Sequence, residues 1–183
     1  RYFGEVEWLT VNAGQGWKRI SSNALLFNSL FDFRDVLIKD NRIYALSLKG
    51  PLCILDFEGN NVEVQLPEDN YFKLVPIEGG PLVAGRKSLS WYSDEKITGS
   101  EELPKTLSAI VEREGVICLF FTDGGYAQMD ASGNIVKKNP LLKDVVTAAY
   151  YDKASKCLLL GVEDGTVYPM NPYDRVMETM AIS

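Results

Sequence analysis

The feature that most constrains the fold of this chain is a hairpin pattern near its C-terminus. The apolar run 157–162 meets a polar turn at 163–165, and a second mostly apolar run follows until the Asn-Pro pair at 171–172. Asp164-Gly165 between two apolar runs is typical of a β-hairpin, because two-residue hairpin turns need positive φ. We therefore expect a β-hairpin here, closed by such a turn.

The same frame occurs three more times along the chain. The four stretches are LKGPLCILD, RKSLSWYSD, TDGGYAQMD and EDGTVYPMN, and their last residues lie at positions 56, 94, 130 and 171, at intervals of 38, 36 and 41. A period of about 40 residues with four short strands per unit is the signature of a β-propeller blade. The frames predict an all-β chain, a β-propeller or a fragment of one, with about four to five four-stranded antiparallel blades. Each frame supplies the middle hairpin of a blade, and we expect the four turns to lie on one common face, at Gly50, Ser88, Gly124 and Gly165.

The chain of 183 residues is 46% hydrophobic and can bury a substantial core, so we expect one globular domain over 1–183. The predicted blades cover 1–30 (a partial blade), 31–67, 70–103, 105–139 and 144–183. An open array leaves a blade face exposed at each end. We expect the chain to be a processed or excised piece that lacks blades, since it has no initiator Met and both ends interrupt repeats. Alternatively, another chain supplies blades, or the N-terminal strands close a small ring.

Two segments are ambiguous. Residues 21–33 fit either a strand or a short helical stretch, and we favour a connection into the next blade. Residues 176–181 fit an outer strand or a short helix. Gly and Pro concentrate between the apolar runs, and no long segment shows a 3.6-residue period, so little helix is expected.

A turn near the N-terminus resembles a known motif. Thr10, Asn12, Gly14 and Trp17 are similar to the Asp-box pattern S/T-x-D/N-x-G-x-x-W of sialidases and of several non-enzymatic propellers. The resemblance implies a fold device, in which the amide bonds the turn backbone and the Trp packs between sheets. The arginine triad of sialidases has no counterpart that we can assign, so their activity is not implied.

The repeats as a whole resemble the β-propeller superfamily with WD40-like blades, although no blade carries a WD dipeptide or a GH pair. The stretch LLLGVEDGTVYPMN is similar to a common propeller hairpin. That form is found in scaffolding subunits of large eukaryotic assemblies and in bacterial sensor domains, so the resemblance implies a fold and leaves the function open.

Charge and composition exclude several functions. The net charge of −6 and the pI near 4.8 disfavour direct nucleic-acid binding. No apolar stretch approaches the 18 residues of a membrane span, and no signal-peptide core is present. The absence of histidine excludes Ser-His-Asp and Cys-His catalysis and removes the commonest transition-metal ligand. We expect no catalytic residues, no metal site and no cofactor.

Cys53, Cys118 and Cys157 fall inside predicted strands among aliphatic residues. Their odd number and wide spacing disfavour a disulfide framework, so we expect three buried, unpaired thiols. This favours an intracellular location, in cytoplasm or nucleus, with an extracellular or periplasmic location as the alternative.

A candidate binding patch lies on the hairpin of the second blade. Arg86 and Lys87 form its turn, and Trp91 and Tyr92 are neighbours on its third strand, so the two aromatic side chains face opposite sides of the sheet. Tyr, Trp and Arg are the residues that most often anchor protein partners. The alternative to a binding patch is a structural role, in which Arg86 and Lys87 form an ordinary polar turn and Trp91 or Tyr92 packs between blades.

The function predicted from these features is a non-enzymatic protein–protein interaction or scaffold module, part of a larger protein or a multi-subunit complex. Its partners are proteins, and additional blades come from the rest of the chain or from another chain. The alternatives are an extracellular carbohydrate-binding or glycosidase-like Asp-box propeller, suggested by the turn at 10–17 and by exposed aromatics, and a bacterial sensor propeller.

Overall fold

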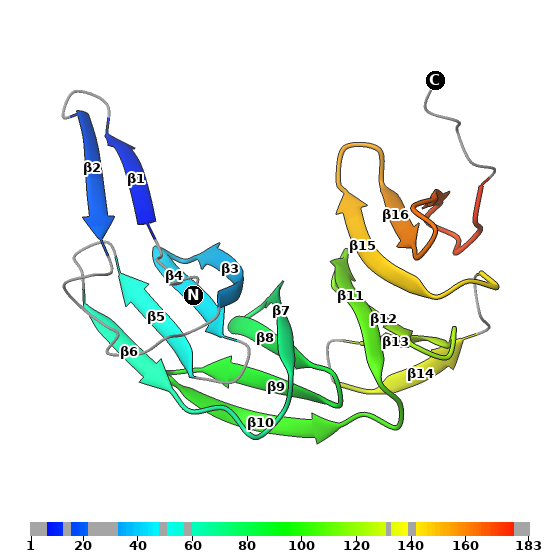
Figure 1. Ribbon diagram of the computed structural model, residues 1–183, viewed down its shortest axis with the longest axis horizontal. Helices are drawn as coiled ribbons and strands as arrows, with labels where there is room; N and C mark the ends of the chain where they lie inside the picture. The colour runs from blue at the N-terminus through cyan, green and yellow to red at the C-terminus, as the bar shows by residue number, and fades with distance from the viewer. Residues whose placement is uncertain are drawn as a thin grey trace. The chain divides into compact units, whose positions relative to one another are not determined.

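The computed structural model describes residues 7–12, 16–21, 33–47, 51–56, 60–130, 133–138 and 142–177. All regular secondary structure within these ranges is β-strand (Figure 1). Every strand pairs antiparallel with its neighbour in sequence, in repeated sheets of up to four strands. The predicted fold class, an all-β propeller of four-stranded antiparallel blades, is confirmed. No helix that could cross a membrane occurs in the described ranges.

The chain divides into two compact units, residues 1–101 and 102–183, and each is described by itself. The first unit holds the hairpin β1 (Glu7–Asn12) and β2 (Gly16–Ser21) and two four-stranded sheets. The first sheet consists of β3 (Phe33–Lys39), β4 (Arg42–Ser47), β5 (Leu52–Asp56) and β6 (Asn61–Val64). The second consists of β7 (Tyr71–Ile77), β8 (Gly80–Gly85), β9 (Ser88–Ser93) and β10 (Lys96–Glu102), whose last residue passes into the second unit.

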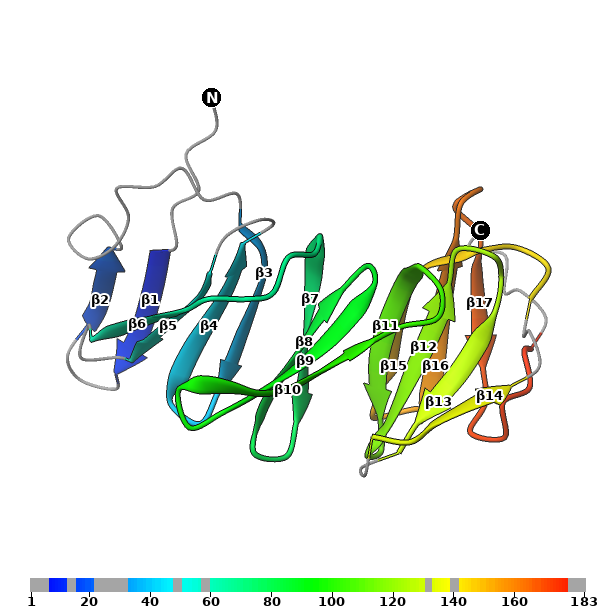
Figure 2. The ribbon, with the colours of Figure 1, turned by 90° about the horizontal axis from the view of Figure 1, so that it is seen from below.

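These two sheets pack face to face in the manner of neighbouring blades. Their first strands, β3 and β7, lie side by side (Figure 2). The apolar cluster between the sheets contains Leu46 and Ile54 from the first and Leu74 and Val83 from the second, all less than 5% exposed. Each sheet thus buries one face against the next, which a single four-stranded sheet in water does not achieve.

The second unit repeats this arrangement. Its first sheet consists of β11 (Leu107–Arg113), β12 (Val116–Phe121), β13 (Tyr126–Met129) and β14 (Ile135–Lys138). Its second consists of β15 (Val146–Asp152), β16 (Cys157–Val162) and β17 (Val167–Met170), followed by a single bridge from Met170 to Val176. Strands β11 and β15 lie side by side, and five of the six residues of β12 are buried.

A β-bulge recurs in the first strand of each of the four larger sheets. The register slips between the first and third residue of the strand, at Phe33/Asp35, Tyr71/Lys73, Leu107/Ala109 and Val146/Ala148. In the first unit the bulge of β3 directs Asp35 at the neighbouring sheet. Its carboxylate accepts a hydrogen bond from the Leu74 amide at 2.7 Å and forms an ion pair with the Lys73 Nζ at 3.1 Å.

The predicted turn at Glu163-Asp164-Gly165 is present, but it is not of the two-residue type that the Asp-Gly pair suggested. The Val162 amide donates to the Thr166 carbonyl and the Gly165 amide to the Val162 carbonyl, both at 3.0 Å, so the loop holds three residues. Only Gly165 adopts positive φ, at 87°, which is the pattern of a type I turn closed by a glycine bulge. Two-residue turns with positive φ at both positions occur instead at Asp40-Asn41 and Glu114-Gly115, between first and second strands, and at Asp94-Glu95, between β9 and β10.

The recurring acidic or amide residue has a structural role at three of its four positions. The Oδ1 atoms of Asp56, Asp130 and Asn171 accept backbone N–H groups four residues on, at 2.8, 3.0 and 3.1 Å, and hold the turn after the third strand. Asp94 instead sits inside a two-residue turn with φ of 50°. The period detected in the sequence therefore marks turn capping.

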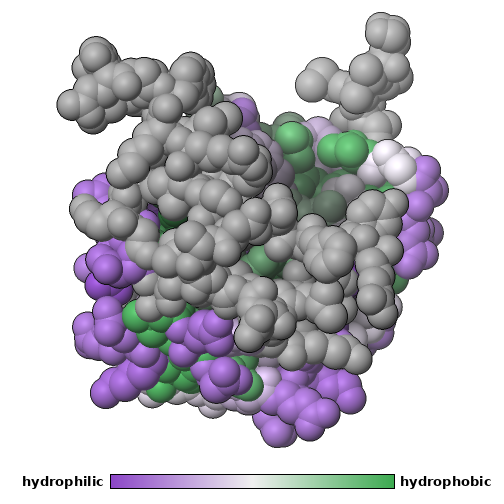
Figure 3. All heavy atoms as spheres, turned by 60° about the vertical axis from the view of Figure 1, so that its left-hand side comes forward, coloured by the Kyte–Doolittle hydropathy of each residue, from purple (hydrophilic) through white to green (hydrophobic). Residues whose placement is uncertain are grey.

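Several expectations fall on residues outside the described ranges: Gly50, residues 22–32 and Gly14 of the Asp-box-like turn. The hairpin that carries this turn is present, with Asn12 opposite Gly16. All three thiols are unpaired, and Cys53 and Cys118 are buried, as predicted; the predicted burial of Cys157 is wrong, since it is half-buried. On the side of the molecule shown in Figure 3, hydrophilic residues gather along the lower margin.

Candidate functional site

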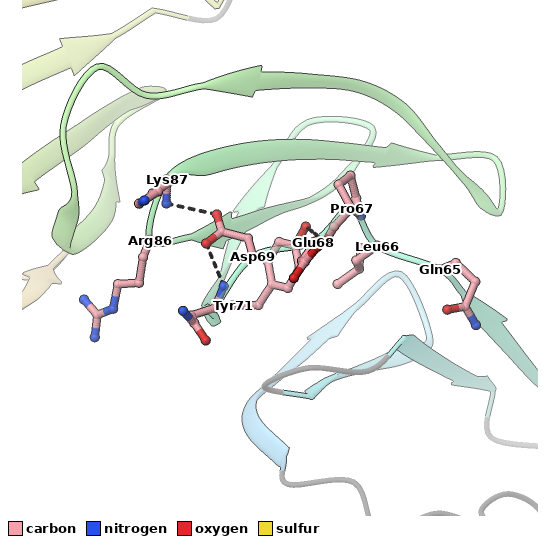
Figure 4. A pocket seen from close by; sticks show the side chains of 9 residues that line it. Gln65, Leu66, Pro67, Glu68, Asp69, Tyr71, Arg86 and Lys87 are labelled. Carbon is pink, nitrogen blue, oxygen red and sulfur yellow. Dashed lines mark hydrogen bonds between the residues drawn. The ribbon is translucent and has the colours of Figure 1, made fainter.

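A groove in the first unit is the candidate site. It has a volume of about 660 Å³ and lies between the connection from β6 to β7 and the turn from β8 to β9 (Figure 4). Its lining consists of Gln65, Leu66, Pro67, Glu68, Asp69, Asn70, Tyr71, Arg86 and Lys87. The two basic residues predicted at the hairpin turn therefore lie in a hollow with polar walls.

Asp69 fastens the two walls of this groove to each other. Its Oδ2 accepts the backbone amide of Lys87 at 2.9 Å and the hydroxyl of Ser88 at 2.7 Å, and its Oδ1 accepts the amide of Asn70 at 2.6 Å. A second link joins the walls, since the Arg86 amide donates to the Asn70 carbonyl at 3.2 Å. The turn that carries the basic side chains is thus fixed by the connection between the sheets.

The environment of Asp69 keeps it ionised. Partial burial opposes the charged form, but hydrogen bonds from the Ser88 hydroxyl and from the backbone amides of Lys87 and Asn70 outweigh it and lower the pKa of the Asp69 carboxyl. Gly85 lets the Asp69 carboxylate approach the turn at Lys87 and Ser88, because a Cβ at position 85 would lie 2.1 Å from the Asp69 Oδ2.

Arg86 and Tyr71 stiffen the groove on either side of Asp69. The Arg86 guanidinium lies over the Phe72 ring, 4.2 Å from its centroid, and its side chain extends away from the Asp69 carboxylate (Figure 4). The Tyr71 hydroxyl donates to the Pro67 carbonyl at 2.6 Å and holds the connecting segment against the sheet. A cation held on an aromatic face loses little side-chain freedom when a ligand binds.

The other two predicted residues lie at the opposite end of β9. Trp91 is half-buried, pairs with Leu82, and approaches Gly99, where an added Cβ would lie 3.8 Å from its ring. Tyr92 is 3% exposed and packs edge-to-face on Tyr44, with ring centroids 5.7 Å apart. The two side chains differ in burial, as their adjacency on one strand predicts. The structure brings Arg86 and Lys87 together and places Trp91 and Tyr92 outside the groove.

Sequence reasoning missed Asp69, and one signal points to it. In the second unit the equivalent turns supply their own acceptor, because Asp123 accepts the Gly125 amide at 3.0 Å and Asp164 the Thr166 amide at 2.8 Å. The turn at 86–87 contains no Asp, so its amides need an acceptor from elsewhere in the chain. Asp69 supplies that acceptor.

A second polar cluster lies in the other unit. Arg113 Nη2 lies 2.7 Å from Asp174 Oδ1, and the Gln128 amide donates to Asp174 Oδ2 at 3.0 Å and to the Tyr126 hydroxyl at 2.7 Å. Burial and the neighbouring Cys118 raise the pKa of the Tyr126 hydroxyl. The cluster ties the turn after β17 to the preceding sheet. In the part of the chain that the structure describes, no three metal-ligating side chains come together.

No family model matches the sequence, and no curated protein matches it. Solved structures do match. Streptogramin B lyase aligns with a TM-score of 0.72 and 13% identity, over 92% of this chain and 59% of that one. The WD40 domain of Neurospora crassa Pan2 aligns with a TM-score of 0.68 and 13% identity, over 82% and 50%. The β-propeller domain of Myceliophteria thermophila Cps50 (Swd1) aligns with a TM-score of 0.67 and 14% identity, over 82% and 55%.

These identities show the fold alone, and the fold is a β-propeller. The chain spans about half the length of the Pan2 and Cps50 chains. The matched structures include WD40 domains and a lyase, so the comparison leaves the function open.

Proposed function

We propose that the chain is a non-enzymatic protein-interaction module, and that it holds an extended segment of a partner protein in the groove lined by Arg86 and Lys87. The WD40 domains among its structural neighbours support an interaction role. The sequence has no histidine, which supports the non-enzymatic part of the proposal. The two buried free thiols support a reducing, intracellular compartment.

The observation that carries the proposal is the fixed presentation of two cations. The backbone of Lys87 is held by Asp69, and the guanidinium of Arg86 rests on Phe72. Both side chains therefore leave a fixed turn, and the Arg86 guanidinium is itself held in place, so binding to Arg86 orders few additional bonds. Arginine is one of the three residue types, with Trp and Tyr, that most often dominate the energy of an interface.

The charges define what the groove selects. An arginine fork pairs best with a planar carboxylate, through two parallel hydrogen bonds. Asp69 already has its acceptor sites occupied by Lys87, Ser88 and Asn70, so it competes little for an incoming ligand. The partner segment is thus expected to bring at least one Asp, Glu or chain-terminal carboxylate to Arg86.

The test combines a groove variant with a charge-matched control. Arg86→Ala/Lys87→Ala removes both groove cations, and Lys96→Ala/Arg175→Ala removes two exposed cations elsewhere. Partners recovered from lysate are identified by crosslinking from a photoreactive residue at Gln65, and their affinity is then measured with purified protein. We expect the groove variant to bind at least about tenfold more weakly, with the thermal midpoint unchanged and the control unaffected. Equal affinity for the groove variant and the native chain would refute the proposal.

A further inference from the structure

One carboxylate of the groove has no part in the binding described so far. Glu68 is exposed on the connection between β6 and β7, and it lines the groove together with Arg86 and Lys87. No ion pair or hydrogen bond joins its side chain to another residue that the structure describes. An exposed glutamate is by itself an ordinary surface residue. Its significance here comes from how its backbone is held and from the charges opposite it.

The backbone on both sides of Glu68 is fixed. On one side the carbonyl of Pro67 accepts the Tyr71 hydroxyl at 2.6 Å. On the other side the carboxylate of Asp69 accepts the Lys87 amide at 2.9 Å. Glu68 therefore projects from an ordered segment, and a ligand that binds its carboxylate restricts only the bonds of the side chain itself.

Opposite charges line this groove without neutralising each other. Glu68 and Lys87 are both exposed, and no ion pair forms between them. The hydrogen bond from the Lys87 amide to Asp69 links the two backbones, so the separation of the two charges is set by the fold. In the view of Figure 4, Arg86 and Lys87 lie toward one end of the lining, Gln65 lies toward the other, and Glu68 lies between them. The groove thus offers a cationic end and a separate anionic position to one ligand.

We propose that the groove selects a partner segment with two opposite charges: the carboxylate that Arg86 binds and a lysine or arginine that Glu68 binds. This inference rests on the proposed function, because it adds a second contact in the same groove. A segment with acidic residues alone brings negative charge toward Glu68, and like charges repel across an interface. The net charge of −6 of the chain acts in the same direction. Glu68 is thus a specificity-determining residue that discriminates against uniformly acidic segments.

A library of decapeptides with capped ends tests this contact. Each peptide carries one fixed glutamate near its centre and varied residues elsewhere, and the peptides retained by the immobilised 183-residue chain are sequenced. We expect Lys or Arg to be enriched at a defined spacing from the fixed glutamate. Glu68→Lys should replace this enrichment by Asp or Glu and weaken binding of the peptides selected by the native chain at least about fivefold. Glu78→Lys, at an exposed glutamate between β7 and β8, is the matched control and should change neither result.

The same library separates this inference from the proposed function. Retention that requires the fixed glutamate and is lost in Arg86→Ala/Lys87→Ala, but shows no preference for Lys or Arg, overturns the inference and leaves the proposed function standing. A basic preference that Glu68→Lys leaves unchanged has the same meaning. Retention that does not depend on the fixed glutamate or on the two groove cations, or no retention at all, overturns both. Circular dichroism confirms folding, and Glu68→Gln, which should abolish the preference without reversing it, replaces Glu68→Lys if the latter does not fold.

Discussion

Replacing Asp174 by alanine should unfold the second unit at markedly lower denaturant. Asp174 accepts Arg113 at 2.7 Å and Gln128 at 3.0 Å, and both donors belong to the preceding sheet. The side chains of Arg113 and Asp174 are 11% and 29% exposed. Removing the carboxylate therefore leaves a guanidinium that is mostly withdrawn from water and has lost its counter-charge.

The magnitude follows from that asymmetry. Breaking a buried ion pair by removing one partner costs about 3–5 kcal/mol, and partial exposure of Asp174 reduces this. The Arg113 Nη1 is already buried without a partner among the described residues, so the guanidinium finds no ready substitute. We expect Asp174→Ala to cost about 2–4 kcal/mol of unfolding free energy. Arg113→Met should cost less, about 1–2 kcal/mol, because the remaining carboxylate reaches water.

The assay must report on the correct unit. The three tryptophans, Trp8, Trp17 and Trp91, all lie in residues 1–101, so their fluorescence does not follow the second unit directly. Urea unfolding followed by far-ultraviolet circular dichroism, with hydrogen exchange of the amides of β11 and β15, reports on it. The double variant Arg113→Met/Asp174→Ala should lose less than the sum of the two single losses. An Asp174→Ala loss below about 0.5 kcal/mol, the level of an ordinary surface change, or strict additivity in the double variant, would refute the reasoning.

Three further predictions concern the first unit and the thiols. The pKa of Asp69 is lowered in the folded state, so its contribution to stability is present above the unfolded pKa of about 3.9 and is lost as pH falls through the folded value; acid titration of Asp69→Asn should show a shallower loss than the native chain. Gly85→Ala should cost about 1–3 kcal/mol in urea unfolding, since its Cβ would meet Asp69, whereas Gly99→Ala, with 3.8 Å to its nearest neighbour, should change stability little. Burial raises the pKa of the Cys53 thiol to about 12, so Ellman's reagent should label half-buried Cys157 before Cys53, and the opposite order would contradict the burial assigned here.

The repeat could be predicted from the sequence because each recurring residue is required by the conformation of its own turn. Gly165 needs positive φ, and Asn171 must accept the amide four residues on, so both identities are constrained by their own turn. The length of the turn was not predictable in the same way. Asp-Gly suits both a two-residue turn and the last two positions of a three-residue turn, and the register between strands decides between them.

The candidate site was half predictable for the same reason. The sequence indicates that Arg86 and Lys87 form a polar turn, because they lie between two apolar runs. Asp69 lies 18 positions before Lys87 and contacts it only because two sheets are joined there. Arg113 and Asp174 are 61 positions apart, and their pairing depends on how one sheet packs on the next. No local pattern in a single sequence records contacts of this kind.

The turn between β8 and β9 depends on a hydrogen-bond acceptor outside it, Asp69, and this dependence couples the turn to ligand binding. Asp69 holds the turn through Lys87 and Ser88, and the same connecting segment forms a wall of the groove. A ligand that orders this wall therefore also fixes the turn, and its binding energy adds to the stability of the first unit by mass action. The turns at Asp123 and Asp164 carry their own acceptors and have no such dependence.

A groove ligand should accordingly slow hydrogen exchange at the Lys87 and Ser88 amides and leave the amides of Gly125 and Thr166 unchanged. Slowing of equal size at all four would show that the ligand stabilises the chain without engaging the groove.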